Sequence, residues 1–219
     1  LYRPQSRPSE FDRGSAGLSG LNPAFSGEDH ILDLTWSSCG SWLAAAEVSG
    51  PIHCLQAGQL CRTWPGHALG TTSLAWKPDQ TLLASCGQDG FVRFWEADAE
   101  SAVRTSPAPD RWSTRLAWHR KGKWLAVAGG RQVAFYQEDG SLDSTTEAHC
   151  STLSDLAWMS HDLTCITAGY QGLQTWSPGK NKPWQRYHWQ GSSVRLAVSP
   201  NQHFIATGDQ TILDALGAA

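Results

Sequence analysis

The tripeptide Leu74-Ala75-Trp76, within the stretch Ser73-Leu74-Ala75-Trp76-Lys77-Pro78-Asp79, decides the fold of this 219-residue chain because its pattern recurs. The pattern is a leucine, a small residue and a large apolar residue, and the third positions are separated by 40, 42, 40 and 40 residues. A fixed period of this length means that each copy is one structural unit that packs against its neighbours. The other copies are Leu34-Thr35-Trp36, Leu116-Ala117-Trp118, Leu156-Ala157-Trp158 and the variant Leu196-Ala197-Val198.

Two further apolar marks follow each tripeptide at fixed distances. Several short strands in each unit of about 40 residues are typical of a propeller blade, which is a small twisted antiparallel sheet. We therefore predict an all-β fold, a β-propeller of four-stranded blades. The marks lie seven residues after the tripeptide, at Leu43, Leu83, Leu125, Cys165 and Ile205, and 18 or 19 residues after it, at Leu55, Trp95, Tyr136, Trp176 and, more weakly, Leu216.

The small middle residue of the tripeptide has a physical reason. Blades approach each other most closely near the central axis of a propeller, so one face of the innermost strand tolerates little bulk. The residues on either side point to the opposite face, because side chains alternate along a strand. A tryptophan there can fill the wider space between two blades.

The second unit resembles the WD40 repeat family most fully, through Gly66-His67, the stretch at 73–79, Leu83-Ala84-Ser85, Asp89-Gly90 and Phe91-Val92-Arg93-Phe94-Trp95. The resemblance extends over about residues 27–210. In that family a hydrogen-bonded set of four side chains braces each well-formed blade. The resemblance implies such a tetrad at His67, Ser85, Asp89 and Trp95, and a partial one at His149, Thr167 and Trp176, with Gln171 in the place of the aspartate.

The repeat divides the chain into about four and a half blades. We expect the blades at residues 27–66, 67–108, 109–148 and 149–190 and a partial one at 191–219 that stops near Ile212. Residues 1–26 are expected to be an irregular segment or a closing outer strand. Seven blades are common in the resembling family, so we expect a fragment of a seven-bladed ring that self-associates through its open blade faces. A closed ring of five blades is the alternative.

Composition and charge narrow the class of protein. The formal net charge is −3, from 17 basic and 20 acidic residues, which argues against a surface built throughout for nucleic acid. No apolar run approaches the length of a membrane-spanning helix. The six cysteines lie far apart in a chain that can build its own core, so we expect free thiols and a cytoplasmic protein.

Motifs for common catalytic chemistry are not found. The chain has no phosphate-binding loop, HExxH, GxSxG or GxGxxG motif, so we predict a non-enzymatic protein without a cofactor or metal. An enzymatic or metal-handling propeller with a site at the channel mouth remains the alternative. Its ligands could include the pair Cys54 and Cys61 or the pair His149 and Cys150, although zinc needs three or four such ligands.

The expected function is a protein–protein interaction scaffold that presents loops to a protein or peptide partner. Six basic residues and no acidic ones lie between Arg111 and Arg131, and Trp, Tyr and Arg dominate binding energy at interfaces. A partner, for which the basic run favours an acidic surface, is therefore expected to contact Arg111, Trp112, Arg131 and Trp184, with Trp64 and Trp189 as further tryptophans outside the repeat. Binding of RNA or an acidic segment through the basic third blade is the second alternative.

Overall fold

The computed structural model describes residues 25–159, 162–208 and 213–217, the last stretch by its backbone alone. Within them, 18 strands form five antiparallel sheets, each built from consecutive strands. The strands are β1 (Ile31–Trp36), β2 (Trp42–Glu47), β3 (Ile52–Gln56), β4 (Gln59–Trp64), β5 (Thr71–Trp76), β6 (Leu82–Gly87), β7 (Phe91–Glu96), β8 (Arg104–Pro107), β9 (Ser113–Trp118), β10 (Trp124–Gly129), β11 (Gln132–Gln137), β12 (Leu142–Thr145), β13 (Leu153–Trp158), β14 (Cys165–Trp176), β15 (Gln185–Ser192), β16 (Arg195–Val198), β17 (Phe204–Gly208) and β18 (Leu213–Gly217).

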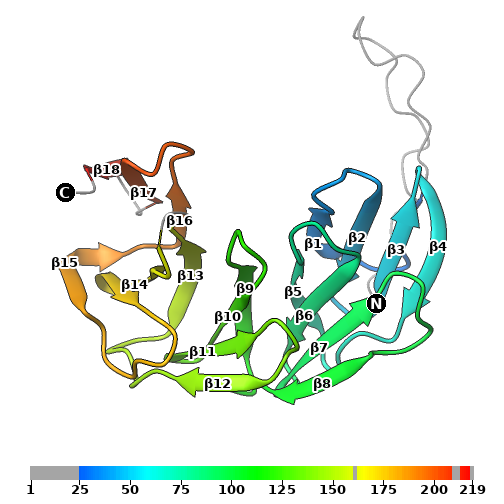
Figure 1. Cartoon of the computed structure of the whole chain (residues 1–219), viewed down its shortest axis with the longest axis horizontal. Coiled ribbons are helices and arrows are strands. Elements are labelled where there is room, and N and C mark those ends of the chain that lie inside the picture. Colours follow the sequence, from blue (N-terminus) through cyan, green and yellow to red (C-terminus); the bar gives the residue numbers. More distant parts are fainter. Residues whose placement is uncertain (1–24, 160–161, 209–212, 218–219) are drawn as a thin grey trace, which may run out of the picture.

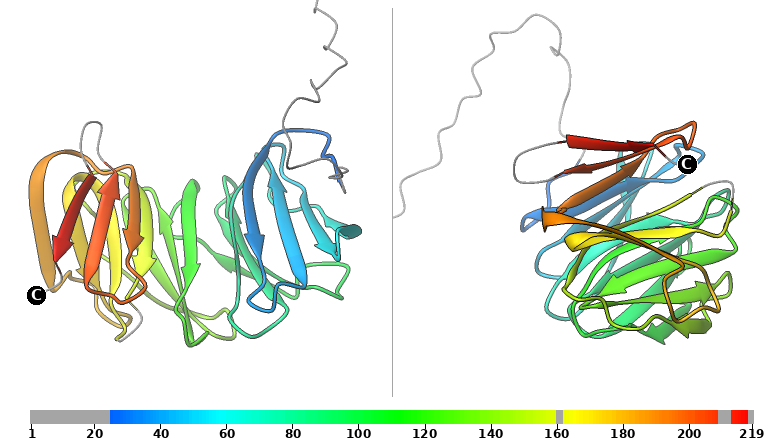
Figure 2. Two further views of the ribbon diagram at one scale, coloured as in Figure 1. Left: turned by 90° about the horizontal axis from the view of Figure 1, so that it is seen from above. Right: turned by 90° about the vertical axis from the view of Figure 1, so that its left-hand side faces the viewer.

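The five sheets follow one another along an open arc (Figure 1). The first strand of each sheet lies on the inner side of the arc, and the last strand of each four-stranded sheet lies on the outer side. Seen from above, neighbouring sheets stand side by side (Figure 2, left). The all-β class and the series of four-stranded blades are confirmed. The described residues include no helix with the length and apolar character needed to cross a membrane.

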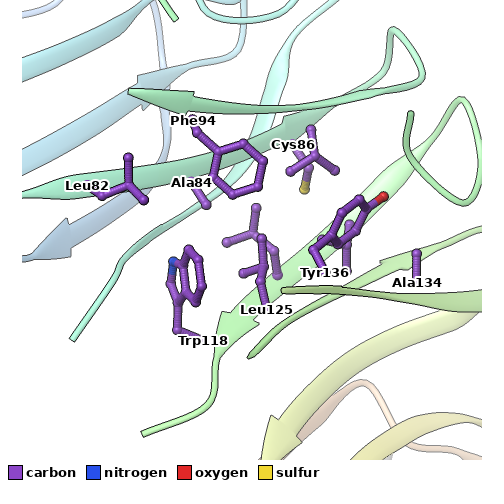
Figure 3. Packing of buried hydrophobic residues seen from close by; sticks show 11 residues of the cluster. Leu82, Ala84, Cys86, Phe94, Trp118, Leu125, Ala134 and Tyr136 are labelled. Atoms are coloured by element: carbon purple, nitrogen blue, oxygen red, sulfur yellow. The ribbon is translucent and has the colours of Figure 1, made fainter. Parts of the chain in front are cut away.

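Apolar side chains fill the space between successive blades. Between the second and third blades, Phe94 packs edge-on against Trp118 at a centroid distance of 6.3 Å, with Leu125 and Tyr136 beside them (Figure 3). Both rings are buried. The repeated tryptophan therefore belongs to the packing between blades, as the alternation of small and large residues on the first strand predicts.

The same tryptophan also ties adjacent blades together by hydrogen bonds. Trp76 Nε1 donates to the carbonyl of Thr35 at 3.1 Å, and Trp158 Nε1 donates to the carbonyl of Ala117 at 2.9 Å. In both cases the acceptor lies 41 residues earlier, on the first strand of the preceding blade. The polar end of a largely buried indole is thereby satisfied.

Two aspartates also link adjacent blades, because each accepts a backbone hydrogen bond from the first strand of the following blade. Asp33 Oδ2 accepts a hydrogen bond from the backbone N–H of Leu74 at 2.8 Å, and Asp155 Oδ2 accepts one from Leu196 at 2.9 Å. Asp155 also faces Arg115 Nε at 3.4 Å. Burial nevertheless raises the pKa of Asp155, because it outweighs these favourable contacts.

The fourth blade contains a sharp chain reversal inside one long strand, β14. Its first half pairs with β13 and its second half with β15. Thr167 and Gln174 nevertheless lie close enough for the threonine hydroxyl to donate to the Gln174 carbonyl at 3.3 Å. Seven residues of extended strand would span more than 20 Å, so the chain must fold back, and it does so at Gln171 and Gly172, whose φ values are 71° and 120°.

The fifth blade extends further than the sequence pattern suggests. The backbone of β18 pairs with β17 from Leu213↔Gly208 to Gly217↔Phe204, with Leu216 opposite Ile205. The sequence pattern places the end of this unit after two strands or partway through its third, near Ile212, whereas the described third strand begins directly after that position. The division of the chain into blades stays a prediction. The predicted closing strand at residues 1–26 falls almost entirely outside the described residues.

The first strand of the first blade leaves an apolar face uncovered. Leu34 and Trp36 are both 60% exposed, whereas Leu74 and Trp76, which occupy the same positions in the second blade, are 4% and 6% exposed. The difference arises because no described blade precedes β1 (Figure 1). The expectation of a larger, seven-bladed ring stays a prediction.

Candidate functional site

The four side chains of the expected tetrad meet between the strands of the second blade. Trp95 Nε1 donates to Ser85 Oγ at 2.8 Å, and Ser85 Oγ lies 2.8 Å from His67 Nε2. On the other side of the ring, His67 Nδ1 lies 2.9 Å from Asp89 Oδ1. One proton arrangement satisfies the whole chain: the serine hydroxyl donates to Nε2 and the imidazole donates from Nδ1 to the carboxylate.

Arg93 is a fifth member of this network. Its Nη1 donates to Asp89 Oδ2 at 2.6 Å and so balances the carboxylate charge. Burial alone would raise the pKa of Asp89, but the hydrogen bonds from His67 and Arg93 outweigh it and lower that pKa. Burial lowers the pKa of His67 despite the aspartate beside it, so the imidazole is neutral at pH 7. In the sequence, Arg93 is marked only by its place two residues before Trp95, on the strand β7.

The fourth blade carries a shorter version of the network. His149 Nε2 lies 3.0 Å from Thr167 Oγ1, and Trp176 Nε1 donates to the same oxygen at 2.9 Å. Gln171 is exposed in the turn, and among the described residues His149 Nδ1 has no hydrogen-bond partner. Burial, together with the positive charges of Arg186 and Arg131, lowers the pKa of His149 to about 4.

One edge of the arc gathers three of the predicted contact residues. The connection from β8 to β9 carries Arg111 and Trp112, and the turn from β10 to β11 carries Arg131. The backbone N–H of Gly130 donates to the carbonyl of Trp112 at 3.2 Å, which holds the two segments together. Trp112 is 65% exposed, whereas Arg131 Nε is engaged by the carbonyl of His149 at 2.6 Å. All three residues are exposed, and within the described residues Arg131 is the one whose side chain is tied to a neighbouring backbone segment.

Two apolar residues on the same edge were missed by sequence reasoning. Leu69, in the connection from β4 to β5, is 70% exposed, and Tyr170, in the turn of β14, is 52% exposed. Leu69 lies in the connection between two blades, as Arg111 does. Tyr170 lies in the turn between the second and third strands of its blade, as Arg131 does. No residue-level pattern marks them, because an isolated leucine or tyrosine is read as a core residue. We define the upper loop face as Leu69, Arg111, Trp112 and Tyr170.

Trp184 lies on the opposite edge from the upper loop face. It stands in the loop from β14 to β15 and is 60% exposed. Successive hairpin turns of an antiparallel blade alternate between its two edges, so this loop shares an edge with the β9–β10 turn. By contrast, Trp64 is fully buried, stacks on Trp95 at 5.3 Å and donates to the carbonyl of Ala99, which makes it part of the core. Trp189 is half-buried.

The basic residues of the third blade do not form one patch. Arg111 and Arg131 lie on the upper edge, and Arg115 is inside β9 facing Asp155. The remaining three lie in or beside the β9–β10 turn on the other edge; these are Arg120, Lys121 and Lys123. A continuous basic strip for RNA is therefore not present on this blade.

The candidate metal ligands lie in ordinary structural surroundings. Burial raises the pKa of Cys54 to about 12, so its thiol is protonated at pH 7. Cys61 is exposed on the neighbouring strand β4, and its thiol points to the carbonyl of Gln59. His149 Nε2 is hydrogen-bonded to Thr167 Oγ1, and Cys150 is an exposed free thiol. Across the described residues no group of three potential ligands comes together.

Comparison with known proteins agrees with the architecture. The family model described as "WD domain, G-beta repeat" matches residues 58–96, the unit that holds the complete tetrad. The WD repeat-containing protein VIP3 of Arabidopsis thaliana is 38% identical over 125 residues, which are 54% of this chain and 38% of that protein. Residues 58–96 thus match the WD40 repeat itself, and the chain as a whole is similar to WD40 repeat proteins.

Other similarities extend over more of the fold. A chain in a crystal structure of the mitotic checkpoint complex superimposes with a TM-score of 0.72 at 24% identity, covering 81% of this chain and 60% of that one. The target of rapamycin complex subunit wat1 of Schizosaccharomyces pombe is 28% identical over 134 residues, which are 59% of this chain and 43% of that protein. The chain thus spans about two-fifths of the length of VIP3 and of wat1.

Proposed function

We propose that this WD40 protein is a non-enzymatic scaffold that binds a protein or peptide partner through the upper loop face. The observation that carries the proposal is the exposure of Trp112 beside Arg111 on loops that are fixed by hydrogen bonds between blades. Tryptophan and arginine are the residues most often responsible for binding energy at interfaces. Loops that are already ordered lose little conformational entropy when they bind.

Further support comes from the way this face is built. The backbone N–H of Gly90 donates to the carbonyl of Arg111, and that of Gln88 donates to the carbonyl of Gly70, next to Leu69. The buried His67 and His149 are hydrogen-bonded inside their blades, a bracing use that supports the proposed role as a scaffold. Several relatives are named as subunits or binding partners of complexes, including the target of rapamycin complex subunit wat1.

A cytoplasmic location is part of this proposal. All six cysteines are free thiols in the structure. Three of them are buried as small apolar side chains, which is a common use of cysteine in a reducing compartment.

Affinity capture from a lysate of the source organism tests the proposed function. Proteins retained by the unmodified chain should be lost with Trp112→Ala, and weakened with Arg111→Glu in a salt-dependent manner. Leu60→Ala is the matched control, because Leu60 is an exposed apolar residue on the outer strand β4, away from the upper loop face. Equal retention by all four proteins would contradict the assignment of the partner to this face.

A further inference from the structure

Two adjoining hollows lie where the third and fourth blades meet, on the edge opposite the upper loop face. The first has a volume of about 290 Å³ and is lined by the β9–β10 turn, with Lys121, Lys123 and Trp124. The second has a volume of about 500 Å³ and is lined by the β14–β15 loop, with Lys180, Lys182 and Trp184. Asp162 and Leu163 line both, so the two hollows form one groove.

This lysine groove concentrates positive charge in a chain whose net charge is −3. It holds four of the five lysines of the sequence, and all four are exposed. None of them forms an ion pair with a carboxylate among the described residues, whereas the fifth, Lys77, lies 3.9 Å from Glu138 Oε2. Asp162 supplies the one carboxylate of the lining, and its Oδ1 already accepts the backbone N–H of Thr164 at 3.0 Å.

The walls of the groove are held in place by neighbouring segments. The backbone N–H of Gly179 donates to Ser144 Oγ at 3.0 Å, and the carbonyl of Asn181 accepts from the backbone N–H of Glu147 at 2.7 Å. These contacts strap the β14–β15 loop of the fourth blade onto the third blade. On the other side, His119 is buried and packs edge-on against Trp158 at 5.3 Å. The groove is therefore present before any ligand arrives.

Apolar surface inside the groove selects among anionic ligands. Trp184 is 60% exposed and lines the second hollow beside Lys180 and Lys182, and Leu163 is 42% exposed and lines both hollows. Outside the groove, the same edge carries the exposed carboxylates of Glu138 and Asp139, in the turn from β11 to β12. Both carboxylates are paired, with Lys77 at 3.9 Å and with Arg104 at 3.5 Å, so unpaired lysine charge among the described residues is confined to the groove. A short anionic segment matches a site of this limited extent better than a long polyanion such as RNA. The chemistry thus favours a short acidic segment with an apolar side chain.

We propose that the lysine groove binds an acidic peptide segment of a partner protein, with carboxylates facing the lysines of both walls and one apolar side chain on Trp184 and Leu163. This inference rests on the proposed function as a protein-binding scaffold. It adds a second binding surface, on the edge opposite the upper loop face. Failure at one face can be distinguished from failure at the other, because the two sets of variants do not overlap.

Fluorescence anisotropy with the full chain tests the groove. The probe is a fluorescein-labelled peptide in which one leucine is flanked on each side by three alternating Asp and Glu residues. Lys121→Glu combined with Lys180→Glu should raise the Kd at least about tenfold, because attraction becomes repulsion on both walls. Binding to the unmodified chain should also weaken steeply between about 50 and 300 mM NaCl. Arg195→Glu, a charge reversal on the fifth blade, should leave the Kd unchanged.

Two further variants separate the effect of charge from the effect of apolar contact. Lys121→Gln combined with Lys180→Gln removes charge without introducing repulsion and should weaken binding about threefold or more, even if the glutamate variant folds poorly. Trp184→Ala should weaken the leucine-containing peptide more than a peptide with serine in its place. An unchanged Kd in the glutamine variant would overturn the proposal. So would tighter binding of a single-stranded RNA of equal charge, which would assign the groove to nucleic acid.

Discussion

The two buried histidines show how much a single partner changes the chemistry of a residue. His67 and His149 each bring Nε2 to a hydroxyl that also accepts an indole N–H. Only His67 has a carboxylate on Nδ1, from Asp89. In the fourth blade the turn is one residue shorter between the Gln171 position and the tryptophan, and the glutamine points to solvent instead of the ring. His149 is thus held neutral by burial and nearby arginines.

We expect acid to destabilise the protein between about pH 6.5 and 4 through His149. Its pKa is about 4 in the folded protein and near 6.5 when unfolded, so in this window the unfolded chain binds a proton that the folded chain does not. The free energy of unfolding should therefore fall as the pH falls through this window, by about 3 kcal/mol from this group. Urea titrations monitored by tryptophan fluorescence at several pH values measure it.

His149→Gln should flatten this pH dependence in part, since His67 and His119 also have lowered pKa values. His203→Gln, at an exposed position, is the control and should leave the slope unchanged. An equal pH dependence in the His149 variant and the unmodified chain would show that the buried ring is not responsible.

At the scale of the element, the chain reversal within β14 is the least regular feature of the blades. Its two halves must face each other so that Thr167 can reach both Trp176 and Gln174. Gly172 makes the reversal possible, because its φ is 120° and a Cβ placed there would collide with the backbone carbonyl of Tyr187 on β15. The bracing network of the fourth blade therefore depends on this one glycine.

Gly172→Ala should lower the free energy of unfolding by about 2 to 4 kcal/mol, because both the backbone angle and the collision with β15 disfavour a side chain. Gly179→Ala is the matched control. It also has a positive φ, of 74°, but a Cβ there would meet no atom within 4 Å. Its cost should be limited to the backbone strain, about 1 to 2 kcal/mol, and chemical denaturation compares the two. Equal losses would mean that contact with β15 is unimportant.

For the whole molecule, the uncovered face of β1 is the main exposed apolar surface at an end of the arc. Interior first strands bury the corresponding residues against the preceding blade, and Trp76 and Trp158 use that blade's carbonyls as hydrogen-bond acceptors. Trp36 occupies the same position in the first blade, but no described blade precedes it. A second copy could supply one, because the first strand of its fifth blade, β16, also stands at an end of the arc (Figure 1).

We expect the chain to self-associate reversibly through this face, since contiguous exposed apolar surface drives association. Trp36→Lys should shift the population toward monomer, which sedimentation velocity over a range of concentrations would show. Val103→Lys is the control, because Val103 is 53% exposed just before the outer strand β8. A chain that remains monomeric at every concentration would contradict this expectation.

The sequence by itself determined the repeated blades, because the spacing of Leu-small-Trp reflects local strand geometry and the taper between sheets. It also placed Trp95 and Trp176 beside their histidines, since each tetrad lies within one blade. The sequence could not group the charged loops. Arg111 and Lys121 are ten residues apart yet lie on opposite edges, because a strand carries the chain across the blade between them. Lys121 and Lys180 are far apart in sequence yet share a groove, because blade packing brings two loops together. Only the tertiary structure decided which side chains form a common surface, since that depends on contacts between blades that no single repeat encodes.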